Sequence, residues 1–112
     1  MGYDTVTKVN ANDVPVGTHG QIHLATGESV GLRLWQVGPR EHDKVASERD
    51  YETVGYVISG HAELEMNGKV LRLEPGDSWL IPKHTEHRYR IVDDFVAIEA
   101  TSPPSHVVAR DL

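Results

Sequence analysis

Cysteine is absent from the 112 residues of this chain. Its absence excludes disulfide bonds, thiol nucleophiles, thiolate-bound iron–sulfur clusters and zinc sites built on cysteine. A metal site in this chain would therefore have to use imidazole and carboxylate ligands.

Basic residues are outnumbered by acidic ones, 11 to 17, which gives a formal net charge of −6. A nucleic-acid partner requires a basic face that displaces counterions from phosphates, so the charge balance argues against one. Long apolar runs are also missing, and residues 1–8 lack the apolar core of a signal peptide. These absences predict a soluble, cytoplasmic protein that binds neither nucleic acid nor a membrane.

Histidine, by contrast, is plentiful: the chain has seven, and imidazole is the commonest metal ligand and acid–base group. A chain of this length is expected to form one domain with one core. We expect residues 1–29 to form an N-terminal arm and strand, residues 30–101 the core, and residues 102–112 a C-terminal tail. Five histidines, at positions 19, 23, 42, 61 and 106, are interpreted as surface residues, which leaves His84 and His87 for chemistry.

Alternating apolar and polar residues predict β-strands through most of the chain. The expected strands cover residues 30–35, 53–59, 78–81, 87–92 and 95–100, and a hairpin covers residues 62–73 with Asn67-Gly68 at its turn. We expect further turns at residues 74–77 and at Asp93-Asp94, and a loop over residues 39–49. Many short strands punctuated by Gly and Pro predict an all-β, antiparallel single domain. A closed barrel is favoured because it leaves no exposed sheet edge.

Residues 76–87, GDSWLIPKHTEH, have a characteristic spacing of Gly76, Pro82 and His87. This spacing resembles the second motif of the cupin superfamily, in which the final His binds a metal ion. Residues 53–60, TVGYVISG, resemble the end of the first cupin motif. The chain is thus similar to small single-domain cupins of the cupin-2 type over about residues 30–101. The resemblance implies a six-stranded jelly-roll barrel, often dimeric, with a small-molecule pocket at its centre.

The first motif departs from the family pattern. Cupins have a His-x-His pair ahead of an acidic residue, whereas this chain has no His at positions 46–49 and has Thr53 in place of the acid. Only His87 matches the usual ligands, and a non-haem metal site generally needs about two imidazoles and one carboxylate. A rebuilt site from His87, Glu48 and His84 is the alternative. The cofactor prediction is accordingly either no metal or one divalent ion: Zn, Fe, Mn or Ni.

Strand parity indicates which side chains line the barrel. If His87 points inward, Tyr89 shares its face, because alternate residues of a strand face the same side. Tyr56 is expected to pack between the sheets. Glu99 is expected on an exposed edge strand, although a buried Glu99 could act as an acid or base. The predicted ligand-binding residues are His87, Tyr89, Thr53 and Trp35.

Three functions are compatible with these residues. The first is a cupin that binds a small organic molecule in its barrel, with a reduced or absent metal site. The second is a metal-dependent enzyme of the dioxygenase, isomerase or polyketide-cyclase kind that uses His87 with Glu48 and His84. The third is a structural or sensory dimer whose interior is filled by its own side chains. The sequence leaves open whether the protein is an enzyme, and predicts a homodimer with a small-molecule ligand.

Overall fold

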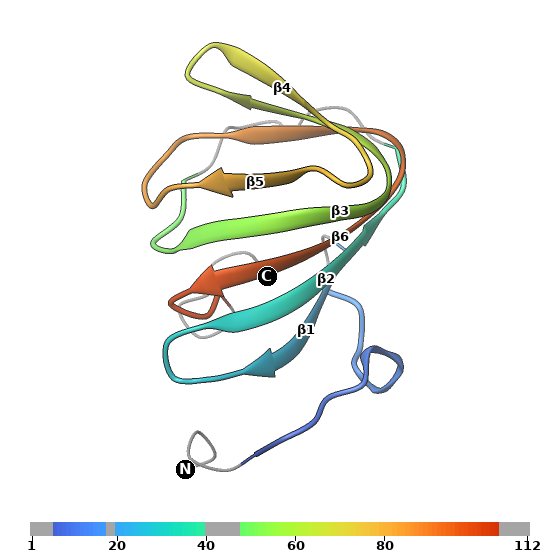
Figure 1. Ribbon diagram of the computed structural model, residues 1–112, viewed down its shortest axis with the longest axis vertical. Coiled ribbons are helices and arrows are strands. Elements are labelled where there is room, and N and C mark those ends of the chain that lie inside the picture. Colours follow the sequence, from blue (N-terminus) through green and yellow to red (C-terminus); the bar gives the residue numbers. More distant parts are fainter. Residues whose placement is uncertain (1–5, 18–19, 40–47, 106–112) are drawn as a thin grey trace.

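Six β-strands make up almost all of the regular structure of the described chain (Figure 1). The computed structural model describes residues 6–17, 20–39 and 48–105. A short 3-10 helix, η1 (Ala11–Asp13), precedes the strands. The predicted all-β architecture is confirmed. The strands are β1 (Gln21–Thr26), β2 (Gly31–Val37), β3 (Glu52–Met66), β4 (Lys69–Leu73), β5 (Ser78–Ile81) and β6 (Arg88–Ser102).

The strands pair antiparallel in the order β1-β2-β6-β3-β4, and β5 also pairs with β3. Two long strands, β3 and β6, have 15 residues each and pair along most of their length, with register shifts between Val57 and Ala62. In Figure 1 both strands curve sharply at the same side of the molecule. Each long strand therefore contributes one half to each of two layers. One layer contains β1, β2 and β5, and the other contains β4, which is a jelly-roll arrangement.

β3 and β6 bend at two positions where the sequence predicts that strands end. Gly60 does not end a strand, and the turn predicted at Asp93-Asp94 is wrong, because β3 and β6 continue through these positions and pair His61 with Asp93. Gly60 has a φ of 81°, and a Cβ at this position would overlap the backbone of Asp94. Glycine thus allows the two strands to bend together at close range, a long-range contact that the alternation within one strand does not reveal.

The predicted hairpin turn between β3 and β4 is confirmed. Asn67 and Gly68 have φ values of 52° and 76°, as a type I′ turn requires. The turn before β5 places Gly76 at a φ of 94°, and the Asp77 carboxylate accepts a hydrogen bond from the Glu74 N–H at 2.8 Å. After the first turn, β4 pairs with the C-terminal half of β3. After the second turn, β5 pairs with the N-terminal half of β3.

Side chains from both layers meet in one apolar core. The Trp35 ring of β2 lies edge-on to the Tyr89 and Phe95 rings of β6, with ring centroids 4.7 Å and 5.9 Å away. Such perpendicular aromatic pairs stabilise a core beyond the area they bury. The buried cluster consists of Trp35, Val57, Ala62, Leu64, Leu73, Trp79, Ile81, Tyr89, Ile91, Phe95 and Ala97.

Tyr56 lies on the outer face of β3, so its predicted place between the sheets is wrong. Its side chain is 49% exposed, whereas the neighbouring Gly55 and Val57 are buried. A Cβ on Gly55 would overlap the Trp79 ring, so this inner position accepts no side chain. Small residues therefore face inward in this half of β3 and larger apolar residues face outward. The outer apolar face is defined here as Leu32, Val54, Tyr56, Ile58 and Leu80.

Candidate functional site

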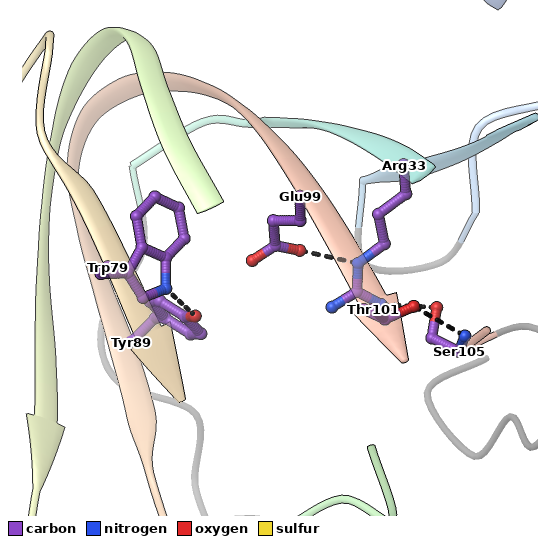
Figure 2. Close-up of polar contacts among 6 residues, drawn as sticks. All are labelled: Arg33, Trp79, Tyr89, Glu99, Thr101 and Ser105. Carbon is purple, nitrogen blue, oxygen red and sulfur yellow. Dashed lines mark hydrogen bonds and ion pairs between the residues drawn. The ribbon is translucent and has the colours of Figure 1, made fainter. Parts of the chain in front are cut away.

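Four neighbouring strands place one residue each in a single row across the inner face of one layer. The register pairs Arg33 of β2 with Glu99 of β6, Glu99 with Gly55 of β3, and Gly55 with Trp79 of β5. Paired residues of antiparallel strands point to the same side of the sheet. Glu99 and Trp79 are buried, so this side is the barrel interior. A guanidinium, a carboxylate and an indole thus lie at one level of the barrel (Figure 2).

Arg33 and Glu99 form a buried ion pair. The Arg33 Nε donates a hydrogen bond to Glu99 Oε1 at 2.6 Å, and the two side chains are only 11% and 2% exposed. The Arg33 Nη1 also donates to Ser105 Oγ at 3.2 Å, and the guanidinium carbon lies 5.7 Å from the centre of the Tyr51 ring. These contacts compensate charges that would otherwise be costly to bury.

The expectation that Glu99 faces solvent from an edge strand is wrong. β6 lies between β2 and β3, so Glu99 belongs to a central strand. Its neighbours Ile98 and Ala100 are the residues that face outward, and both are half-buried. Because Ile98 and Ala100 are apolar, the sequence suggests that they face the interior and that Glu99 faces solvent. The register that pairs Glu99 with Arg33 places the Glu99 carboxylate in the interior instead.

Hydroxyl side chains flank the row on one side. Thr53 of β3 pairs with Thr101 of β6, and both are buried. After β6 the chain turns back, and the Ser105 N–H donates a hydrogen bond to Thr101 Oγ1 at 2.8 Å. On the other side of the row, Trp35 pairs with Ala97. The interior of this layer is therefore polar toward one end and apolar toward the other.

Tyr89 reaches this row from the other layer. Its hydroxyl oxygen accepts a hydrogen bond from Trp79 Nε1 at 3.2 Å (Figure 2). Burial, together with the nearby charge of Glu99, raises the pKa of Tyr89 well above its ordinary value of 10.0. Tyr89 therefore keeps its proton at neutral pH and is available as a hydrogen-bond donor.

Three of the four predicted ligand-binding residues, Thr53, Trp35 and Tyr89, are buried in the barrel. The fourth, His87, is half-buried just ahead of β6. Its Nδ1 lies 2.9 Å from the Thr85 carbonyl oxygen, and its ring centroid lies 5.7 Å from that of Tyr89. The structure thus gathers three of these residues inside the barrel with His87 against Tyr89, and their role in binding stays a prediction.

Sequence reasoning missed Arg33, Tyr51 and Ser105. Arg33 alternates with Trp35 along β2, so placing Trp35 in the interior also places Arg33 there. That signal was present in the sequence. No sequence signal indicates Ser105, because its contacts with Arg33 and Thr101 depend on the reversal of the chain after β6.

The predicted metal ligands are not gathered into one group. Glu48 is exposed, and the His84 side chain is 60% exposed with its Nδ1 3.6 Å from Asp50 Oδ1. Thr53 occupies the acidic position of the motif and offers no carboxylate. Within residues 6–17, 20–39 and 48–105, no group of three or more His, Cys, Asp or Glu side chains could hold a metal ion. These residues by themselves do not fit the implied metal site, and the metal role of His87, Glu48 and His84 stays a prediction.

The remaining histidines fall in different environments. His61 pairs with Asp93, with its Nδ1 3.0 Å from Oδ2, and both side chains are well exposed, as expected for a surface position. His23 is half-buried and pairs in register with Arg33, so it is less exposed than expected. The other three, His19, His42 and His106, lie outside the described residues.

The jelly-roll fold and this interior define the class of protein. The family described as "Cupin domain" matches residues 33–101. The chain therefore belongs to the cupin family, and the resemblance stated from its motifs is confirmed. The match begins at Arg33 and ends at Thr101, so it contains the buried row. No curated protein matches the chain.

Solved structures share the fold at low sequence identity. KdgF from Halomonas sp. has a TM-score of 0.77 and 22% identity, covering 96% of this chain and 97% of that one. Ectoine synthase from P. lautus has a TM-score of 0.75 and 16% identity, covering 89% and 79%. An RmlC-like cupin from Shewanella frigidimarina NCIMB 400 has a TM-score of 0.69 and 21% identity, covering 88% and 84%. Identities this low show a common fold alone.

In the described ranges, no helix has the length and apolar character needed to cross a membrane.

Proposed function

We propose that this cupin binds a small organic molecule inside its barrel, beside the row that contains Arg33, Glu99 and Trp79. The buried ion pair is the observation that carries the proposal. Replacing a buried ion pair by apolar residues is often neutral or stabilising, so the fold alone gives no reason to bury these two charges. A few converging polar groups among aromatic rings are typical of small-molecule sites.

Intrinsic fluorescence offers a direct test. The chain has two tryptophans, Trp35 and Trp79, and both are buried in the interior. We expect a saturable change in their emission on titration with at least one member of a panel of small aromatic and alicyclic alcohols, hydrocarbons, amines and carboxylates. If no compound in the panel changes the emission, the proposal is contradicted.

A matched pair of variants separates interior from surface binding. Thr53 and Val54 are neighbours on β3, but Thr53 is 5% exposed and Val54 is 51% exposed on the opposite face. Thr53→Leu adds apolar volume inside and is expected to weaken binding at least tenfold, whereas Val54→Leu is expected to leave it unchanged. Equal weakening by the two substitutions would place the bound compound outside the barrel. Far-UV circular dichroism checks that both variants fold.

Catalysis at the same row is a second candidate function. The Glu99 carboxylate lies near the protonated Tyr89 phenol, which supplies a proton acceptor and a proton donor. Incorporation of solvent deuterium into a bound compound would distinguish turnover from binding alone. The metal-dependent alternative with His87, Glu48 and His84 requires in addition a bound divalent ion. Elemental analysis of protein purified without a metal-affinity tag would detect that ion.

A further inference from the structure

Two buried polar groups in the interior have hydrogen-bonding capacity that no described residue uses. Glu99 accepts from Arg33 through Oε1, and no donor from the described ranges reaches its Oε2. Tyr89 accepts from Trp79, and no described side chain or carbonyl accepts its hydroxyl proton. Leaving a buried donor or acceptor without a partner is unfavourable, because the group has lost its hydrogen bonds to water. Two such groups in one interior indicate that something else pairs with them.

The two groups face the same part of the barrel. In Figure 2 the second carboxylate oxygen of Glu99 is turned away from Arg33, toward the side where Trp79 and Tyr89 meet. Glu99 and Tyr89 are also close enough for the carboxylate charge to raise the pKa of the phenol. An acceptor and a donor therefore border one location next to the indole of Trp79.

We propose that a hydroxyl group of the bound ligand occupies this location, donating a hydrogen bond to Glu99 Oε2 and accepting one from the Tyr89 hydroxyl. This inference rests on the proposed binding function and names its ligand class, an uncharged alcohol. A hydroxyl both donates and accepts, which is what the two groups together require. A carboxylate cannot donate and is repelled by Glu99, and an ammonium group cannot accept from Tyr89.

The surroundings determine the rest of the ligand. Trp35 and Phe95 stand next to Tyr89 and Trp79, with Trp35 and Tyr89 ring centroids 4.7 Å apart and Trp79 and Phe95 centroids 6.5 Å apart. Ala97 and Val57, both fully buried, belong to the packed apolar core behind these rings. The hydroxyl is accordingly carried by a compact apolar body, such as an aromatic or alicyclic ring, rather than by a polyol.

The test compares molecules of one shape that differ in a single group. The aromatic series is benzyl alcohol, ethylbenzene, benzylamine and benzoate, and the alicyclic series is cyclohexanol, methylcyclohexane and cyclohexanecarboxylate. We expect the alcohol of each series to bind at least about tenfold more tightly than the other members of that series, which corresponds to about 1.4 kcal/mol. Trp fluorescence and saturation-transfer NMR report the dissociation constants.

A conservative variant tests the contact itself. Tyr89→Phe removes one oxygen atom and is expected to abolish the preference for the alcohol over its methyl analogue. Tyr56→Phe removes the same atom from an exposed side chain and is expected to retain the preference. Comparison of the analogues in the wild-type protein requires no substitution, so the test stands even if Tyr89→Phe fails to fold.

The outcomes separate this inference from the proposed function. If both the alcohol and its methyl analogue bind with equal affinity, the hydroxyl site is overturned and water is the group that fills it, while small-molecule binding stands. Retention of the preference in a folded Tyr89→Phe protein also overturns the hydroxyl site. If neither series binds at all, both the inference and the proposed function fail.

Discussion

At the scale of single residues, the most consequential feature is a phenol buried near a carboxylate. Burial and the Glu99 charge both raise the pKa of Tyr89. The raised pKa keeps Tyr89 protonated as a donor. It also makes the free energy of unfolding depend on pH in the alkaline range, because the folded chain retains a proton that the unfolded chain releases.

We therefore expect the free energy of unfolding to fall as pH rises above about 10, where an unfolded tyrosine ionises. Below that pH the contribution of Tyr89 is fully present, and it is lost as pH rises toward the higher pKa of the folded state. One such group contributes a slope of at most about 1.4 kcal/mol per pH unit. Urea denaturation at a series of pH values from 8 to about 11 would measure the slope.

Tyr89→Phe is expected to flatten this slope, whereas Tyr56→Phe, on the exposed face of β3, is expected to preserve it. Parallel stability curves for the wild type and Tyr89→Phe would show that another group causes the alkaline loss.

At the scale of elements, the bend shared by β3 and β6 builds the two layers. It depends on Gly60, which has a positive φ and lies against the backbone of Asp94. Gly76 also has a positive φ, at 94°, but nothing lies within 4 Å of the position of its absent Cβ. Substitutions at these two glycines therefore distinguish the cost of backbone strain from the cost of close packing between strands.

Gly60→Ala is expected to destabilise the protein more than Gly76→Ala. Both substitutions force an L-residue into left-handed backbone geometry, at a cost of about 1–2 kcal/mol. Only Gly60→Ala adds overlap with a neighbouring strand, which costs about 1–3 kcal/mol more. Chemical denaturation of the two variants measures the difference, and equal losses would mean that β6 moves aside without penalty.

At the scale of the whole molecule, the outer apolar face gathers exposed apolar side chains from three strands. Its five side chains are between 39% and 51% exposed and carry no charge, on a chain with a formal net charge of −6. At this exposure they present roughly 400 Å² of apolar surface, within the range of the largest apolar patch on a typical monomer, which is often functional. A stable interface buries about 800 Å² from each partner, so this face supplies about half of one, with its half-buried neighbours and a polar rim adding area.

A second copy of the chain is the expected occupant of this face. Two molecules of like net charge approach each other most readily through surfaces without charge. In a two-fold dimer the same face meets itself, so one substitution alters the interface twice. We therefore expect the predicted homodimer to form through the outer apolar face on β2, β3 and β5.

Val54→Lys is expected to convert the dimer to a monomer, raising the dissociation constant at least about 100-fold, because it introduces a charge on each side of the apolar contact. Val70→Lys is the matched control, since Val70 is 54% exposed on β4, outside the outer apolar face. Sedimentation velocity over a concentration series measures both. A wild-type monomer at about 100 μM, or equal effects of the two substitutions, would contradict the proposed interface.

The sequence determined the fold because fold signals are local. Asn67-Gly68 specifies its turn through the backbone freedom of two adjacent residues, and residues 76–87 carry the Gly, Pro and His spacing of the second cupin motif. Those signals predicted an all-β single domain and the cupin family. They also selected Trp35, Thr53 and Tyr89, which the structure places inside the barrel.

Only the tertiary structure decided that Glu99 faces the interior and that Tyr56 faces outward. An alternating pattern does not specify which of the two faces of a strand points inward. On β3 the larger apolar side chains face outward, because the Trp79 ring occupies the space next to Gly55 on the inner face. The pairing of Arg33 with Glu99 joins residues far apart in the chain through the register of β2 and β6. The sequence alone excluded cysteine chemistry. The contact between the charged Arg33 and Glu99 side chains in the barrel, by contrast, depended on the alignment of β2 with β6.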